Sequence, residues 1–137
     1  MSNKLIIYTD GAARGNPGPA AIGVVIKDAA GKTVATVSRC LGAATNNQAE
    51  YQAVIAGLEK AISLGARQVL LKSDSELVVK QLMGRYKVKN AGMREMYSRV
   101  VQLTGKLEKF SAVNIPRGQN AQADALCNEA LDGEKGK

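Results

Sequence analysis

The sequence contains no histidine and no tryptophan, and its aromatic residues amount to one phenylalanine and four tyrosines. The lack of histidine excludes every mechanism that needs a histidine base and every metal site that needs a histidine ligand. With so few aromatic side chains, base stacking of the kind that single-strand-binding proteins use is not expected to dominate contact with a nucleic acid.

Long hydrophobic runs are also missing. No stretch approaches the roughly 20 apolar residues that span a bilayer, and the N-terminus lacks the basic-then-apolar pattern of a signal peptide. We therefore expect a cytoplasmic protein with no membrane contact. The two cysteines, Cys40 and Cys127, have the spacing of neither a metal site nor a redox motif, which favours two free thiols and leaves a bridge between them open.

The length of 137 residues and the apolar fraction of 45% are typical of one globular domain. We place this domain at residues 1–131, followed by a short polar tail at 132–137 that is expected to be disordered. We expect a monomer.

Positive charge is in excess, because 19 lysines and arginines outnumber 12 aspartates and glutamates and leave a net charge of +7. Between Lys72 and Arg99, seven basic residues stand against three acidic ones, so more than half of the excess lies in about a fifth of the chain. A solvated helix face can carry such charge, but a concentrated basic segment favours contact with phosphates.

Apolar periodicity and clusters of turn formers predict strands and helices in the order β-β-β-α-β-α-α-β-α. Short turns join the first three strands, which predicts an antiparallel meander, and helical crossovers make the last two strands parallel. The expected fold is α/β, a five-stranded mixed sheet flanked by helices. A loop at 42–45 precedes the first helix, which Thr45 or Asn46 is placed to cap. The strands are expected at 5–10, 20–27, 32–41, 67–72 and 109–115, and the helices at 46–64, 75–83, 93–107 and 120–131.

Four acids occupy unusual places in this pattern. Asp10 and Asp74 each follow an apolar strand, whereas Glu50 and Asp124 lie in the first turns of helices. Strand C-termini and the starts of the following helices meet at one edge of such a sheet, so we expect the four carboxylates to converge. All-oxygen ligation suits Mg²⁺ or Mn²⁺ rather than zinc, and two such ions about 4 Å apart serve in-line displacement at phosphorus. Taken singly, each acid is explained as a helix cap or a partner of a helix dipole.

Four stretches of the sequence resemble, in order, the four motif blocks of type 1 ribonuclease H. They are YTDGAARGNPGPAAIGVVI, TNNQAEYQAVIAGLEKA, LLKSDSELVVKQL and IPRGQNAQADALCNEAL, and together they cover about half of the chain. The resemblance implies the ribonuclease H fold and hydrolysis of the RNA strand of RNA/DNA hybrids to 5′-phosphate and 3′-hydroxyl ends. It also implies two Mg²⁺ (or Mn²⁺) ions in each active site.

The resemblance assigns a role to each acid. Asp10 is implied to bridge both ions, Glu50 and Asp74 to hold the ion near the leaving oxygen, and Asp124 to help hold the ion that carries the nucleophilic water. Amide and hydroxyl groups suit the 2′-hydroxyls and phosphates of a wide minor groove. The implied substrate contacts are the backbone of Gly11 and the side chains of Asn16, Thr45, Asn46, Asn47, Ser75 and Arg117.

The chain departs from the family pattern in its loops. Many members carry a histidine upstream of the last acid, where this chain has PRGQNAQAD; Arg117 is the nearest substitute, able to steady a phosphate but a poor base. Glu76 stands after Ser75 where several members have an amide. The connector at 84–92 is too short for the family's basic protrusion. The chain therefore resembles the compact form, and we expect weaker or less selective hybrid binding.

Other readings stay open at this point. A related two-ion nuclease would act on double-stranded RNA, or within a larger repair or transposition system. A module that binds hybrids without cutting them, or a purely structural domain, would leave the four acids unexplained. A P-loop is excluded, because no Gly-Lys-Ser/Thr follows GAARGNPG.

Overall fold

The computed structural model describes residues 3–135, with side chains described for 3–133. It contains one five-stranded sheet, as predicted, with the strand order β3-β2-β1-β4-β5. The first three strands pair antiparallel, and β4 and β5 continue the sheet in parallel with β1. The strands are β1 Lys4–Ala13, β2 Gly18–Asp28, β3 Thr33–Ala44, β4 Gln68–Ser73 and β5 Lys109–Asn114.

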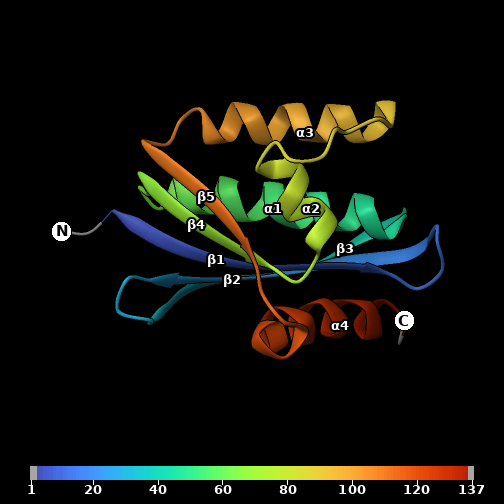
Figure 1. The fold of residues 1–137 in the computed structure, drawn as a ribbon. Helices are drawn as coiled ribbons and strands as arrows, with labels where there is room; N and C mark the ends of the chain where they lie inside the picture. The colour runs from blue at the N-terminus through green and yellow to red at the C-terminus, as the bar shows by residue number, and fades with distance from the viewer. Residues whose placement is uncertain (1–2, 136–137) are drawn as a thin grey trace.

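Helices cover both faces of the sheet (Figure 1). Three of them lie on one face, and the last helix lies on the other. Among the described helices, none is long and apolar enough to cross a membrane. The helices are α1 Asn46–Ser63, α2 Glu76–Leu82, α3 Ala91–Thr104 and α4 Ala121–Lys135, with a short 3₁₀ turn, η1, at Arg117–Asn120.

The main core lies between the sheet and α1, where the apolar stripe of that helix meets the apolar residues of the strands. Thr45 caps α1 by a capping box: its side chain accepts from the backbone N–H of Gln48, whose side chain accepts in turn from the N–H of Thr45. The helix ends before Gly65, which adopts a positive φ of 89°. The largest fully buried apolar side chains are Ile7, Ile22, Ile26, Tyr51, Leu58, Leu71 and Leu103.

Three strands, β1, β2 and β3, are longer than predicted, and β2 extends beyond the expected 20–27 at both ends. Asp10 lies inside β1 rather than at its end, because the small residues after it continue the antiparallel pairing with β2 as far as Ala13. Only the parallel pairing with β4 stops at Thr9, so the acid still marks the point where that half of the sheet ends. Likewise, β3 runs to Ala44 through the predicted loop at 42–45, because its pairing with β2 continues there.

The bounds of two helices, α3 and α4, are also corrected. Helix α3 begins at Ala91 instead of residue 93, because the side chain of Asn90 accepts a hydrogen bond from the N–H of Met93 and caps the helix. It ends at Thr104 rather than residue 107. Helix α4 continues to Lys135, since one glycine inside a helix costs only about 1 kcal/mol and no stronger stop follows residue 131. Residues 132–135 of the expected tail are therefore helical, and 136–137 lie outside the described residues.

Helix α4 packs closely on the other face of the sheet because β2 carries a glycine beneath it. A Cβ on Gly23 would meet the backbone of Ala123 and Cys127. Two β3 side chains, Ser38 and Cys40, donate hydrogen bonds to carbonyls of α4, at 2.7 and 3.0 Å. Cys40 and Cys127 form no disulfide bond with each other, in line with the predicted thiols.

Candidate active site

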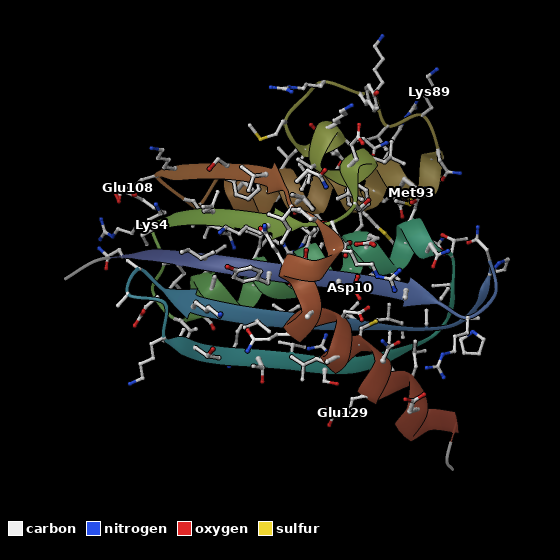
Figure 2. All side chains as sticks on the ribbon, turned by 60° about the horizontal axis from the view of Figure 1, so that its bottom comes forward. Lys4, Asp10, Lys89, Met93, Glu108 and Glu129 are labelled. Carbon is white, nitrogen blue, oxygen red and sulfur yellow. The ribbon has the colours of Figure 1, made fainter. Side chains whose placement is uncertain are left out.

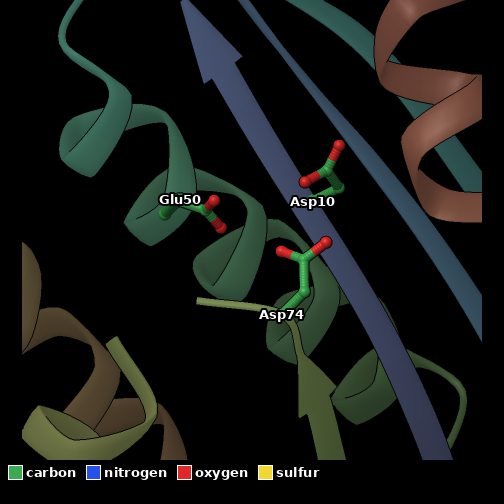
Figure 3. A group of neighbouring side chains, drawn as sticks. All are labelled: Asp10, Glu50 and Asp74. Atoms are coloured by element: carbon green, nitrogen blue, oxygen red, sulfur yellow. The ribbon is translucent and has the colours of Figure 1, made fainter. Parts of the chain in front are cut away.

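Three of the four predicted acids form one cluster at the carboxyl edge of the parallel strands (Figure 3). Asp10 comes from β1, Glu50 from the first turns of α1, and Asp74 from the residue after β4. Each offers a carboxylate oxygen, and these oxygens all lie within 4.8 Å of one another. The parallel register pairs Thr9 with Ser73, so the two aspartates follow neighbouring positions on adjacent strands. The predicted convergence is confirmed for these three residues.

The fourth acid, Asp124, approaches the cluster from the opposite layer. It lies in the first turn of α4, and its side chain and charge act on Asp10, although it is not a member of the three-carboxylate cluster. The guanidinium of Arg117 lies 3.9 Å from its Oδ1. The four acids therefore come from three layers of the molecule: α1, the sheet and α4.

The cluster strongly disfavours negative charge in the absence of a cation. Burial, with the charge of Asp74 and hydrogen bonding to Asp124 next in importance, raises the pKa of Asp10 to about 7. Burial also raises the pKa of Glu50 to about 9, with smaller contributions from the charges of Asp10 and Asp74, against a lowering by the backbone of Gly11. Near neutral pH the site thus binds protons unless another positive charge replaces them.

The donor set fits a divalent cation with hard oxygen ligands. One carboxylate oxygen of Glu50, Oε2, is buried and has no hydrogen-bond partner among the described residues. A buried carboxylate oxygen without a partner is costly, and a cation held between Glu50 and the two aspartates would satisfy it. The described residues near the cluster include no histidine, because the chain has none.

Gly11 brings the layers together at the cluster. It is buried, and a Cβ at this position would meet the backbone of Ala49 and Glu50 in α1. Only glycine therefore allows α1 to approach β1 closely enough for Glu50 to reach Asp10. The resemblance assigns the backbone of Gly11 to substrate binding, and this assignment stays a prediction; the structure shows that the residue also packs beneath α1.

Two predicted substrate residues tie the β1–β2 turn to the start of α1. The side-chain oxygen of Asn46 accepts from the N–H of Ala13 at 2.8 Å, and that of Asn16 accepts from the N–H of Asn46 at 3.0 Å. Both side chains are exposed. Because their oxygens are engaged, their Nδ2 groups remain as donors toward a ligand.

The other predicted contacts lie around the same edge. Thr45 is the cap of α1, and Asn47 is exposed in its first turn. Ser75 caps α2 by accepting from the N–H of Val78. Arg117 lies in η1 with its side chain 82% exposed, on the α4 side of the cluster.

One residue that sets the geometry of the site could not be identified from the sequence. Asn120 is buried, and its amide donates a 2.8 Å hydrogen bond to the carbonyl of Thr9. It stands in the fourth motif block, but its position before the helix of Asp124 did not by itself indicate a buried contact with β1.

The fold and this carboxylate cluster define an α/β domain of the ribonuclease H-like class. The model of the family described as reverse transcriptase-like matches residues 8–130. Ribonuclease HI of Halobacterium salinarum is 46% identical over 125 residues, and a bifunctional protein of Mycobacterium tuberculosis is 42% identical over 130 residues. This chain belongs to the ribonuclease H family.

Solved structures agree with that assignment. The crystal structure of the Halobacterium RNase H1 matches with a TM-score of 0.92 and 45% identity, over 95% of this chain and 98% of that one. The LC11-RNase H1, isolated from compost and solved in complex with an RNA/DNA hybrid, matches with a TM-score of 0.91 and 44% identity, also over 95% and 98% of the two chains. This chain nevertheless spans only part of the length of the Halobacterium and mycobacterial relatives. The alignments include 91% and 94% of this chain but only 63% of the Halobacterium sequence and 36% of the mycobacterial one.

Proposed function

We propose that this chain is a metal-dependent endonuclease that hydrolyses the RNA strand of RNA/DNA hybrids and leaves 5′-phosphate and 3′-hydroxyl ends. The three-carboxylate cluster, with its buried and unpartnered Glu50 oxygen, is the observation that carries this proposal. The hybrid bound to LC11-RNase H1 supports the choice of substrate, because that protein has the same fold at 44% identity.

Four residues would hold two ions, Mg²⁺ or Mn²⁺. Asp10 is central, because it faces Glu50 and Asp74 on one side and Asp124 on the other. When bound, such ions supply an activated water and stabilise the negative charge that develops at phosphorus. The chain contributes the fixed spacing of the acids, since Gly11 holds α1 against β1 and Gly23 holds α4 against the sheet.

The exposed polar groups beside the cluster would bind the substrate strand. The Nδ2 donors of Asn16 and Asn46 suit 2′-hydroxyl and phosphate oxygens, and Thr45, Asn47 and Ser75 add hydroxyl and amide groups along the same edge. Their placement on helix caps and a tied turn gives them fixed positions.

Arg117 would steady a phosphate where many relatives use a histidine. Its guanidinium is exposed and stays charged at neutral pH, so it can bind a phosphate oxygen but serves poorly as a base. We infer a change in rate or metal dependence rather than a loss of activity.

Cleavage of a labelled RNA/DNA hybrid in Mg²⁺ or Mn²⁺ tests the proposal, with Asp10→Asn as the inactive variant. Asparagine keeps the size of the side chain and removes its charge, so we expect internal cuts in the RNA by the wild type and a loss of several orders of magnitude in the variant. Glu129→Gln is the matched control, because Glu129 is an exposed acid on α4. Binding of the hybrid without cleavage in either metal would contradict the proposal and favour a non-catalytic module.

A further inference from the structure

Part of one sheet face has no helix on it. Helix α4 packs on β2, β3 and β1, whereas α1, α2 and α3 lie on the other face. In the view that brings the α4 side forward, β4, β5 and the N-terminal half of β1 are open (Figure 2). This open face is continuous with the site, because Tyr8 and Asp10 are two residues apart on β1 and point to the same side.

Two lysines on this open face are held over one aromatic ring. The ammonium of Lys27 lies 5.2 Å from the centre of the Tyr8 ring, and that of Lys72 lies 5.3 Å from it. The lysines come from the two strands that flank β1, because Tyr8 pairs with Val25 of β2 and with Lys72 of β4. Two like charges held on the same ring repel each other, and the ring quadrupole offsets only part of that repulsion. An anion bound close to these ammonium groups would offset the rest.

The surrounding charge on these strands is mainly positive. Lys4 and Lys109 lie on the same face, since they are register partners of Gln68, which is four residues before Lys72 on β4. Among the described residues of β1, β2, β4 and β5, the only acid on this face is Asp10 itself; Asp28, next to Lys27, alternates to the other side. A small hollow of about 70 Å³ between Lys4 and Lys109 opens near the far end of the face.

We propose that Lys27 and Lys72, positioned by Tyr8, form a phosphate-binding site for the backbone of the nucleic acid that occupies the carboxylate cluster. Two strand residues span about 7 Å, so a nucleic-acid strand leaving Asp10 can reach the lysine pair within a few nucleotides. Because the ammonium groups lie over the Tyr8 ring, we expect the ring not to stack on a base. The contact would therefore recognise the charge of the phosphate and not the identity of the base. The inference rests on the proposed function for the kind of ligand, and it adds a contact outside the acid cluster.

Binding measured against salt tests this site. The Asp10→Asn background prevents cleavage, and fluorescence anisotropy gives the affinity for a labelled RNA/DNA hybrid over a series of salt concentrations. In this background Lys27→Gln with Lys72→Gln should weaken binding about tenfold at low salt and reduce the slope of log K against log salt by about 2. The matched control is Lys60→Gln with Lys106→Gln, which removes the same charge from exposed lysines of α1 and of the segment after α3. It should leave the slope nearly unchanged.

The ring provides an independent test. Tyr8→Phe keeps the ring and should bind like the background protein, whereas Tyr8→Leu frees the two lysines and should weaken binding several-fold. Thermal unfolding of each variant shows whether the fold is retained, and the comparison with Tyr8→Phe separates the loss of the ring from a general loss of packing.

Equal affinity and equal salt slope for both lysine pairs would overturn the proposal. A second result would also overturn it: the Lys27→Gln, Lys72→Gln variant keeps its affinity for the hybrid but no longer binds vesicles of anionic phospholipid. The face would then contact a membrane surface instead of a nucleic acid. Failure of the proposed function is distinguishable: the wild type would not cut the hybrid, although a salt slope that depends on these lysines would still support the phosphate site.

Discussion

Asn120 and Thr9 are joined by a hydrogen bond of 2.8 Å between residues 111 positions apart, from the side-chain amide of Asn120 to the backbone carbonyl of Thr9. Thr9 precedes Asp10 on β1, and Asn120 precedes the helix that carries Asp124. This bond therefore fixes the start of α4 against the strand that holds the central acid. Asn120 is 1% exposed, so water cannot replace the bond if it is removed.

Asn120→Ala should lower both stability and activity. We expect a loss of about 1–3 kcal/mol in the free energy of unfolding, because the carbonyl of Thr9 is left without this donor. Activity should fall further than stability explains, since Asp124 loses its fixed distance from Asp10. Urea unfolding and hybrid cleavage measure the two effects. Gln119→Ala, at an exposed neighbour, should change neither; equal effects of the two variants would contradict this role.

Gly23→Ala should separate α4 from the sheet. The added Cβ meets the backbone of Ala123 and Cys127, which cannot move without shifting the whole helix. We expect a loss of about 2–4 kcal/mol and a large loss of activity through Asp124. Gly133→Ala on the same helix meets nothing within 4 Å and should stabilise slightly. Thermal unfolding compares the two; a Gly23→Ala protein of normal stability would show that the sheet accommodates the methyl group.

The metal-free protein should lose stability as the pH rises from about 5 to about 9. The pKa of Glu50 is about 9 in the fold and 4.5 as its ordinary value, so the folded chain holds a proton that the unfolded chain releases. The free energy of unfolding must then fall with rising pH in this interval. Asp10, with its pKa raised to about 7, acts in the same direction.

Thermal unfolding in a chelator across this pH range checks that slope. Glu50→Gln cannot ionise, so it should flatten the slope and raise the melting temperature above that of the wild type at pH 8. Adding Mg²⁺ should stabilise the wild type more at pH 8 than at pH 6, because fewer protons compete for the carboxylates. Glu129→Gln should keep the wild-type slope; a flat wild-type profile would mean that the acids stay ionised without metal.

Arg117→Ala should slow cleavage without changing stability. The side chain is 82% exposed and its ion pair with Asp124 is long, at 3.9 Å, so little folding energy depends on it. We expect kcat to fall about tenfold through loss of one phosphate contact. Arginine does not titrate near neutral pH, but the charge of Arg117 lowers the pKa of Asp10, so the ratio of wild-type to variant rates should be larger at pH 6 than at pH 9. Arg67→Ala, which removes an exposed arginine paired with Glu108, is the control.

Selectivity for hybrids should be moderate. The segment between α2 and α3 is a short connector, and no large protrusion is present among the described residues to hold the DNA strand. We expect the affinities for hybrid, double-stranded RNA and double-stranded DNA, measured with Asp10→Asn protein at one salt concentration, to differ less than in a relative with the protrusion. A tight and exclusive preference for the hybrid would contradict this expectation.

Local patterns predicted most of the elements and the three clustered acids. The apolar run before Asp10 and the helical spacing after Thr45 are strong signals, because burial and capping act over a few residues. Strand ends were less predictable. Whether β1 stops at Asp10 depends on its two partners: β4 ends there and β2 does not.

Contacts between distant segments could not be predicted from local patterns. The bond from Asn120 to Thr9 and the lysine pair over Tyr8 both depend on the register of strands that are far apart in the sequence. In the sequence, Lys72 belongs to a basic segment, and nothing local connects it with Lys27. The two lysines meet at Tyr8 only because β2 and β4 lie on either side of β1 in the sheet.

Two glycines, Gly11 and Gly23, allow helices on opposite faces of the sheet to pack closely beside Asp10. Gly23 is the antiparallel partner of Asp10, and Gly11 follows it on β1, so α1 and α4 both press closest to the sheet around this acid. The distances between the carboxylates therefore depend on how closely α1 and α4 pack against the sheet. We therefore expect that loosening one outer layer would disperse the carboxylates while the strands remain paired, so that the proposed activity would be lost before the fold.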